Sequence, residues 1–161
     1  MSVATAGRPR GALGLLASLL ACFGVAGLGG YWTTLGLGPW FDGLRKPPWN
    51  PPASAFGPVW TLLYVGMAVA AWRVWRVRGW GWPMRLFGVQ LALNAAWTGL
   101  FFALRRPGWA LVEIIALWLT IAATTRAFAR SDRLAAVLML PYLAWVSFAG
   151  VLNAAIWRLN S

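Results

Sequence analysis

Five predominantly apolar stretches, separated by short polar or basic intervals, dominate the sequence. They cover residues 11–32, 54–75, 84–104, 107–129 and 133–157. A helix needs about 20 apolar residues to cross a bilayer, and each stretch has about that length. A helix also satisfies its own backbone hydrogen bonds, which lipid cannot do. The pattern therefore predicts an all-α membrane protein, a single domain over residues 1–161 built as a bundle of five transmembrane helices.

The first loop, over about residues 33–53, is the longest interval between the predicted helices. Four prolines within residues 40–52 stiffen it, and Trp40 and Trp49 make it amphipathic. Two interpretations stay open. The loop is either a rigid turn anchored at the membrane interface by its aromatic rings, or a lid over a pocket between the helices.

Polar and aromatic residues recur along four of the predicted helices at spacings of three, four and seven, which place them on one helix face. The stripes are Trp60, Tyr64 and Met67; Gln90, Asn94, Trp97 and Phe101; Trp109, Glu113, Thr120 and Thr124; and Tyr142, Trp145, Ala149 and Asn153. Polar side chains face acyl chains only at a cost, so we expect these stripes to point inward. Together they predict an aromatic cavity for a flat, largely apolar ligand. Alternatively, the amides simply bond the helices to one another.

Composition supports a membrane protein and excludes several other classes. Hydrophobic residues make up 60% of the chain and charged residues only 11%, too few for a soluble domain. The net charge of +11 comes from basic residues near the ends of the apolar stretches, where lipid phosphates rather than nucleic acid are the expected partner. The chain has no histidine and a single cysteine, Cys22, so we expect no metal site, no intrachain disulfide and no required cofactor.

The loop charges predict an orientation. Nine basic residues lie on the side of the N-terminus and five on the other, so the positive-inside rule places the N-terminus in the cytoplasm of a bacterial cell. The first stretch also resembles a signal peptide, but its length favours a retained helix.

Four motifs carry a resemblance to a known family. They are residues 40–52 (WFDGLRKPPWNPP), 57–64 (GPVWTLLY), 90–97 (QLALNAAW) followed by Phe101 and Phe102, and 141–145 (PYLAW) followed by Leu152 and Asn153. In this order they resemble the TspO/MBR family of tryptophan-rich sensory proteins and translocator proteins. The stretch 151–158 lacks the tyrosine of the cholesterol motif proposed for animal members, which favours a bacterial member and speaks against sterol recognition there.

The resemblance implies a membrane receptor or carrier that binds porphyrins, such as protoporphyrin IX or haem, and regulates tetrapyrrole levels or transport. It places Trp60, Asn94, Trp97, Tyr142, Trp145 and Ala149 in the ligand pocket. With the residues from the stripes and the loop, the candidate ligand-binding set is Trp49, Trp60, Tyr64, Gln90, Asn94, Trp97, Phe101, Tyr142, Trp145, Ala149 and Asn153.

Two alternatives assign the chain a different activity. Trp60 and Trp145 match tryptophans that the resemblance links to light-dependent porphyrin breakdown, so one alternative is a porphyrin-degrading enzyme. The other is a proton-coupled transporter, which rests on Glu113 alone, the only acid in the middle of a span. A binding protein rather than an enzyme is the preferred interpretation.

Small residues at four-residue spacing predict close helix packing. One ridge consists of Gly14, Ser18, Cys22, Ala26 and Gly30, and another of Ala95, Gly99 and Ala103. We expect the first ridge to pack inside the bundle and the second to form a homodimer interface.

Overall fold

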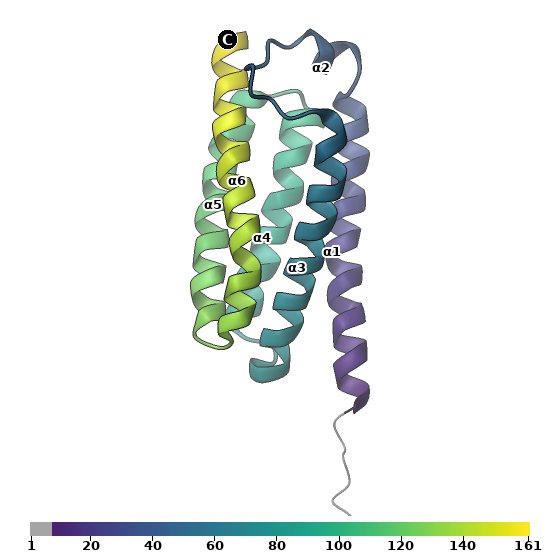
Figure 1. The fold of residues 1–161 in the computed structure, drawn as a ribbon, viewed down its shortest axis with the longest axis vertical. Helices are drawn as coiled ribbons and strands as arrows, with labels where there is room; N and C mark the ends of the chain where they lie inside the picture. Colours follow the sequence, from purple (N-terminus) through teal and green to yellow (C-terminus); the bar gives the residue numbers. More distant parts are fainter. Residues whose placement is uncertain (1–7) are drawn as a thin grey trace, which may run out of the picture.

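The five predicted spans are helices in the computed structural model, which describes residues 8–161 (Figure 1). The spans are α1 (Arg8–Gly36), α3 (Ala53–Arg78), α4 (Trp82–Thr98) with its π-helical continuation η1 (Gly99–Ala103), α5 (Pro107–Ala129) and α6 (Arg133–Asn160). Within this described part of the chain, five helices are long and apolar enough to cross a membrane. The prediction of an all-α bundle of five spans is therefore confirmed.

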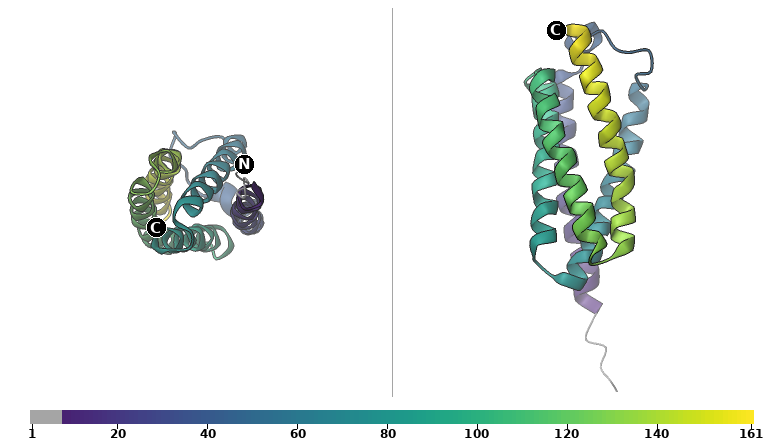
Figure 2. Two further views of the ribbon diagram at one scale, coloured as in Figure 1. Left: turned by 90° about the horizontal axis from the view of Figure 1, so that it is seen from below. Right: turned by 90° about the vertical axis from the view of Figure 1, so that its left-hand side faces the viewer.

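The helices pack as an up-and-down bundle, and Figure 2 shows it end-on and from the side. Contacts between neighbours close a ring in the order α1, α3, α6, α5, α4. The α3–α4 and α5–α6 turns lie at one end of the bundle, and the first loop lies at the other end together with the C-terminus. Buried residues from all five spans form the main hydrophobic core of the bundle.

The helix ends differ from the expected bounds mainly in α1. The sequence predicted an end at residue 32, just after the glycine pair Gly29–Gly30, but the helix continues to Gly36. A glycine costs a helix about 1 kcal/mol, and packing outweighs that cost here. Gly29 is buried, and a Cβ built on Gly36 would lie 2.7 Å from the carbonyl oxygen of Phe102. These glycines thus allow α1 to approach α4 closely rather than ending the helix.

The first loop contains a short helix that the sequence did not predict, α2 (Pro39–Gly43). Proline at its first position fixes a helical backbone angle. Gly38 precedes it with φ of 93°, a conformation that favours glycine. The loop therefore crosses the end of the bundle as an ordered turn of helix followed by the proline-rich segment 47–52.

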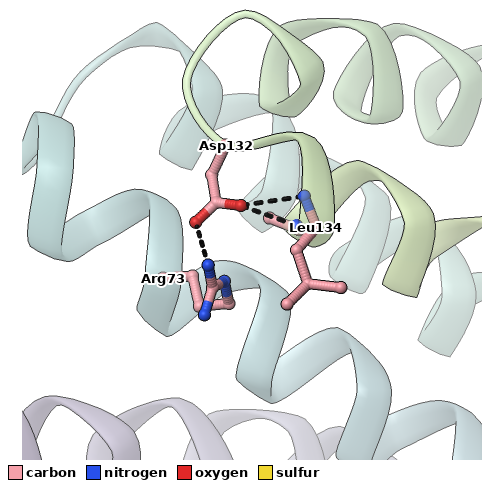
Figure 3. A network of polar contacts seen from close by, with 4 residues as sticks. Arg73, Asp132 and Leu134 are labelled. Atoms are coloured by element: carbon pink, nitrogen blue, oxygen red, sulfur yellow. Dashed lines mark hydrogen bonds and ion pairs between the residues drawn. The ribbon is translucent and has the colours of Figure 1, made fainter.

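A charged cluster joins α3 to the start of α6 at the opposite end (Figure 3). The guanidinium of Arg73 lies 2.8 Å from the carboxylate of Asp132. Asp132 also caps α6 by accepting hydrogen bonds from the amides of Leu134 and Ala135. Desolvation raises the pKa of this carboxyl, but the Ala135 amide, Arg73 and the Leu134 amide together outweigh it and hold the pKa below its ordinary value.

The two small-residue ridges both meet neighbours within the chain. In α1, Cys22 is fully buried and Gly14 lies against Trp72 and Trp75 of α3, as expected for internal packing. The α4 ridge departs from the expectation. Ala95 is buried, and a Cβ built on Gly99 would lie 3.2 Å from the Trp32 ring of α1. This side of Gly99 is occupied by α1 and is not free for a second copy of the chain.

Candidate functional site

A cavity of about 460 Å³ lies inside the bundle, toward the end that carries the first loop. Residues of α1, α3, α4, η1, α6 and the first loop line it. The volume falls in the range of small-molecule sites, roughly 300–1,000 Å³. Among the described residues, no Asp, Glu, Lys or Arg side chain lines this cavity.

Most of the predicted ligand-binding residues lie around this cavity. Those that line it are Trp60, Tyr64, Asn94, Trp97, Phe101, Trp145, Ala149 and Asn153. Three others lie outside its lining. Trp49 is 46% exposed and packs on Phe148, with ring centroids 5.9 Å apart. Gln90 is fully buried deeper in the bundle, where its amide nitrogen lies 3.9 Å from the sulfur of Met67. Tyr142 is also fully buried, behind the lining.

Aromatic rings form one wall of the cavity where α3 faces α6. The centroids of Trp60 and Trp145 are 6.5 Å apart and their planes stand at 87°. Tyr64 lies 5.7 Å from Trp60, and Phe56 and Phe148 flank Trp145 at 5.8 and 5.5 Å. Edge-to-face pairs at such distances stabilise each other by about 0.5–1.5 kcal/mol beyond area burial. The wall therefore holds flat apolar surfaces in fixed orientations.

A chain of hydrogen bonds joins three helices beneath this wall. The hydroxyl of Tyr64 donates to Oδ1 of Asn94 at 2.5 Å, and Nδ2 of Asn94 donates to the hydroxyl of Tyr142 at 2.9 Å. All three residues are buried. Asn94 thus bonds α3 and α6 to α4, as the helix-bonding interpretation expected, and it also lines the cavity.

A second polar chain fixes the ring of Trp97. Its indole nitrogen donates to Oδ1 of Asn153 at 3.0 Å, and Nδ2 of Asn153 donates to the carbonyl of Pro107 at 2.8 Å. Trp97 also lies 5.5 Å from the ring of Phe101 in η1. The π-helical turn places Phe101 and Phe102 at the cavity, and such turns occur frequently at functional sites.

The first loop covers the end of the cavity and is held there by contacts to two helices. The ring of Trp40 lies 6.1 Å from Phe101, and that of Phe41 lies 5.7 Å from Phe102. At the other side, Asn160 makes paired hydrogen bonds to the backbone of Arg45, accepting from its amide and donating to its carbonyl, both at 2.9 Å. Because Phe41, Asn50 and Pro51 line the cavity, the loop forms its roof.

The ammonium group of Lys46 binds carbonyl groups at the C-terminal end of α2. It donates to the carbonyl oxygens of Phe41 and Leu44 and lies 4.4 Å above the Phe41 ring. Arg45 is exposed beside it.

The polar stripe predicted on α5 does not contribute to the cavity. Among the described residues, none from α5 lines it. Trp109 is 67% exposed, and the hydroxyls of Thr120 and Thr124 bond to carbonyls one turn earlier in their own helix. Both carboxylate oxygens of Glu113 are buried, and within the described residues they have no hydrogen-bond partner. The expectation that this stripe faces the cavity is therefore corrected.

The contribution of α1 is the part of the lining that the sequence did not reveal. Phe23, Ala26, Gly29, Gly30 and Thr33 line the cavity on this side. Their spacing of three or four was the available signal, but small residues at that spacing also describe ordinary helix packing.

Comparison with known proteins places the chain in a family. The model of the TspO/MBR family matches residues 18–158. The chain belongs to this family. The human translocator protein is 44% identical over 127 residues, which cover 75% of this chain and 75% of the human protein. The tryptophan-rich sensory protein of Cereibacter sphaeroides is 44% identical over 121 residues, covering 75% and 77% of the two chains. The tryptophan-rich protein TspO of Chlorobaculum tepidum is 40% identical over 146 residues, covering 86% and 90%.

Membership in the TspO/MBR family and the five apolar helices establish an integral membrane protein. The four motifs that carried the resemblance now have a structural place. Residues 57–64 and 90–97 supply facing walls of the cavity, the segment 141–153 supplies a third, and residues 40–52 supply the roof.

Proposed function

We propose that this protein binds porphyrins, such as protoporphyrin IX or haem, in the cavity roofed by the first loop, and so acts as a receptor or carrier that regulates tetrapyrrole levels. The observation that carries the proposal is the cavity itself, which is aromatic, uncharged and about 460 Å³ in volume. A porphyrin is a flat aromatic ring, and indole faces are suited to stack on it. Family membership supports the same ligand class.

The lining also sets how a porphyrin would lie. Its propionate groups are anionic, and an anion desolvated without a partner is strongly disfavoured. Since no charged side chain in the described residues lines the cavity, the ring lies inside and the propionates lie toward the first loop, where the exposed guanidinium of Arg45 is available. Trp60, Trp97 and Trp145 contact the ring.

Titration of protoporphyrin IX into the protein in lipid nanodiscs tests this proposal through quenching of tryptophan fluorescence. We expect saturable quenching, with weaker binding in Trp60→Phe and in Trp145→Phe. The control is Trp80→Phe, because Trp80 is 82% exposed in the α3–α4 turn, at the end away from the first loop. Quenching that does not saturate, or three variants that behave alike, contradicts binding at this site.

A second function is favoured by the contact between Trp60 and Trp145 in the cavity wall. We propose as the alternative that dioxygen oxidises the light-excited bound porphyrin and is itself reduced, with these indoles relaying electrons between the two. In that case Trp145→Phe loses the illuminated product, measured by absorbance, while retaining most of the binding. Equal product in darkness or in Trp145→Phe refutes the alternative and leaves the binding proposal intact.

A further inference from the structure

The residues that line the cavity differ sharply in their exposure. Those from α4, η1, α6 and the first loop after Leu37 are buried or half-buried. The exposed ones all belong to α1 and the residue after it, or to α3: Phe23, Gly30, Leu37, Ala53, Gly57 and Thr61. The cavity therefore reaches the surface of the bundle between α1 and α3.

Close packing of α1 on α3 confines this opening to the half of the bundle nearest the first loop. The indole nitrogen of Trp72 donates to the carbonyl of Gly11 at 2.6 Å, and Gly14 lies directly against Trp75. Farther along the same pair of helices, Cys22 is fully buried. α1 and α3 thus seal the bundle over the half away from the first loop, and Figure 1 shows them side by side along this length.

The contacts loosen in the half nearest the first loop. A Cβ built on Gly30 in α1 or on Gly57 in α3 would have no atom of the described residues within 4 Å. Both glycines line the cavity, and both lie inside spans that face acyl chains. The two side chains that flank them, Phe23 and Leu37, are 39% and 47% exposed. The opening is therefore lateral, within the bilayer, and bordered by small and apolar residues.

In the described part of the chain, the first loop covers the end of the cavity. The first loop is fixed there on one side by Trp40 and Phe41 against η1 and on the other by Asn160. A ligand that reached the cavity from water would have to undock this loop, whereas the lateral opening is present with the loop in place.

We propose that the gap between α1 and α3 is the entrance through which the uncharged aromatic ring of a ligand passes directly between the acyl chains and the cavity. This inference rests on the proposed binding function and adds the route of the ligand and the charge state of the part that passes. The hydroxyl of Thr61 donates a hydrogen bond to the carbonyl of Gly57 at 2.9 Å, so this hydroxyl is not available as a donor to a ligand. The border therefore presents no free donor or charge to a passing molecule, and ionised groups remain at the membrane interface.

The test measures rates rather than affinity alone, with the uncharged dimethyl ester of protoporphyrin IX as the probe. Gly30→Phe narrows the entrance, and Gly24→Phe is the matched control on the same helix. Gly24 is exposed, has equally open space around it and does not line the cavity. Stopped-flow tryptophan quenching in nanodiscs gives the association and dissociation rates.

An entrance controls both directions of passage equally. Gly30→Phe is therefore expected to slow association by about tenfold, an added barrier of about 1.4 kcal/mol, and to slow dissociation as well. Gly24→Phe is expected to match the unsubstituted protein. Unchanged rates in Gly30→Phe refute the entrance. A weaker Kd with an unchanged association rate also refutes it, because the introduced phenyl ring then occupies the binding site rather than the entrance. Absent binding of protoporphyrin IX to the unsubstituted protein refutes the proposed function instead.

A reversible block keeps the test decisive if Gly30→Phe does not fold. Gly57→Cys in a Cys22→Ala background is labelled after folding with a bulky methanethiosulfonate and then released with a reductant. The entrance is supported if labelling slows the exchange of the ester and the reductant returns the exchange rate to its value before labelling. Fast exchange with complete labelling refutes it.

Discussion

Replacing Asn160 with Ala should release the roof of the cavity while leaving the bundle folded. The change removes both hydrogen bonds between the side chain and the backbone of Arg45. A typical hydrogen bond contributes about 0.5–1.5 kcal/mol net, and exposed ones lie at the lower end. The pair therefore stabilises the docked loop by about 1–2 kcal/mol, and its loss raises the open fraction by about 5–30-fold.

Amide hydrogen exchange in nanodiscs measures this opening. The best reporter is the amide of Asn50, whose acceptor is the carbonyl of Pro47 and is untouched by the substitution. We expect its exchange to accelerate by the same factor as the open fraction, whereas amides in the middle of α6 keep their protection. Ser161→Ala is the control, since the hydroxyl of Ser161 donates to the carbonyl of Arg158 and, among the described residues, has no bond to the loop. If Asn50 exchanges equally in the two variants, the paired bonds do not hold the loop and the reasoning fails.

Other predictions concern packing, charge and orientation. Asn94→Ala leaves two buried tyrosine hydroxyls without this partner and should cost about 1–3 kcal/mol per orphaned group, seen as a lower melting temperature in detergent. Because the pKa of Asp132 is lowered in the folded state, its ionised carboxylate stabilises the fold above the unfolded pKa of about 3.9, and this contribution is lost as the pH falls through the lower folded pKa. Asp132→Asn should therefore lessen the drop in melting temperature as the pH falls below about 3.9. Gly99→Leu should destabilise the monomer by displacing the Trp32 ring, whereas Gly88→Leu, in open space, should not; equal melting temperatures contradict this packing. Asn50→Cys should react with an impermeant thiol reagent from outside the cell if the N-terminus is cytoplasmic, and labelling only after lysis reverses the orientation.

The sequence predicted the helices and the aromatic side of the cavity for the same physical reason. Lipid forces an apolar span to be helical and forces Asn94 and Asn153 to find partners inside the bundle. The prediction failed on α5 because Thr120 and Thr124 satisfy their hydroxyls on their own helix and need no cavity. A threonine is therefore weaker evidence of an inward polar face than an asparagine. The side-chain amide of asparagine has more hydrogen-bond donors and acceptors than the backbone of its own helix can pair.

Two features could not be predicted from the sequence for another reason: the contribution of α1 to the cavity and the π-helical turn. Glycines such as Gly30 have no side chain to indicate a face, and the same spacing fits packing, a dimer or an opening. η1 packs against α1 where Gly36 meets the backbone of Phe102, a tertiary contact that no local pattern encodes. Both features arise from the approach of two helices rather than from either helix alone.

The absence of charged side chains from the cavity lining, among the described residues, has an electrical consequence. Moving one elementary charge across a membrane potential of 100 mV changes the free energy by about 2.3 kcal/mol. An uncharged ring that enters an uncharged cavity from the acyl chains moves no charge through the field. Occupancy should therefore be the same in energised and de-energised membranes, so that the protein responds to the amount of its ligand and not to the energetic state of the cell.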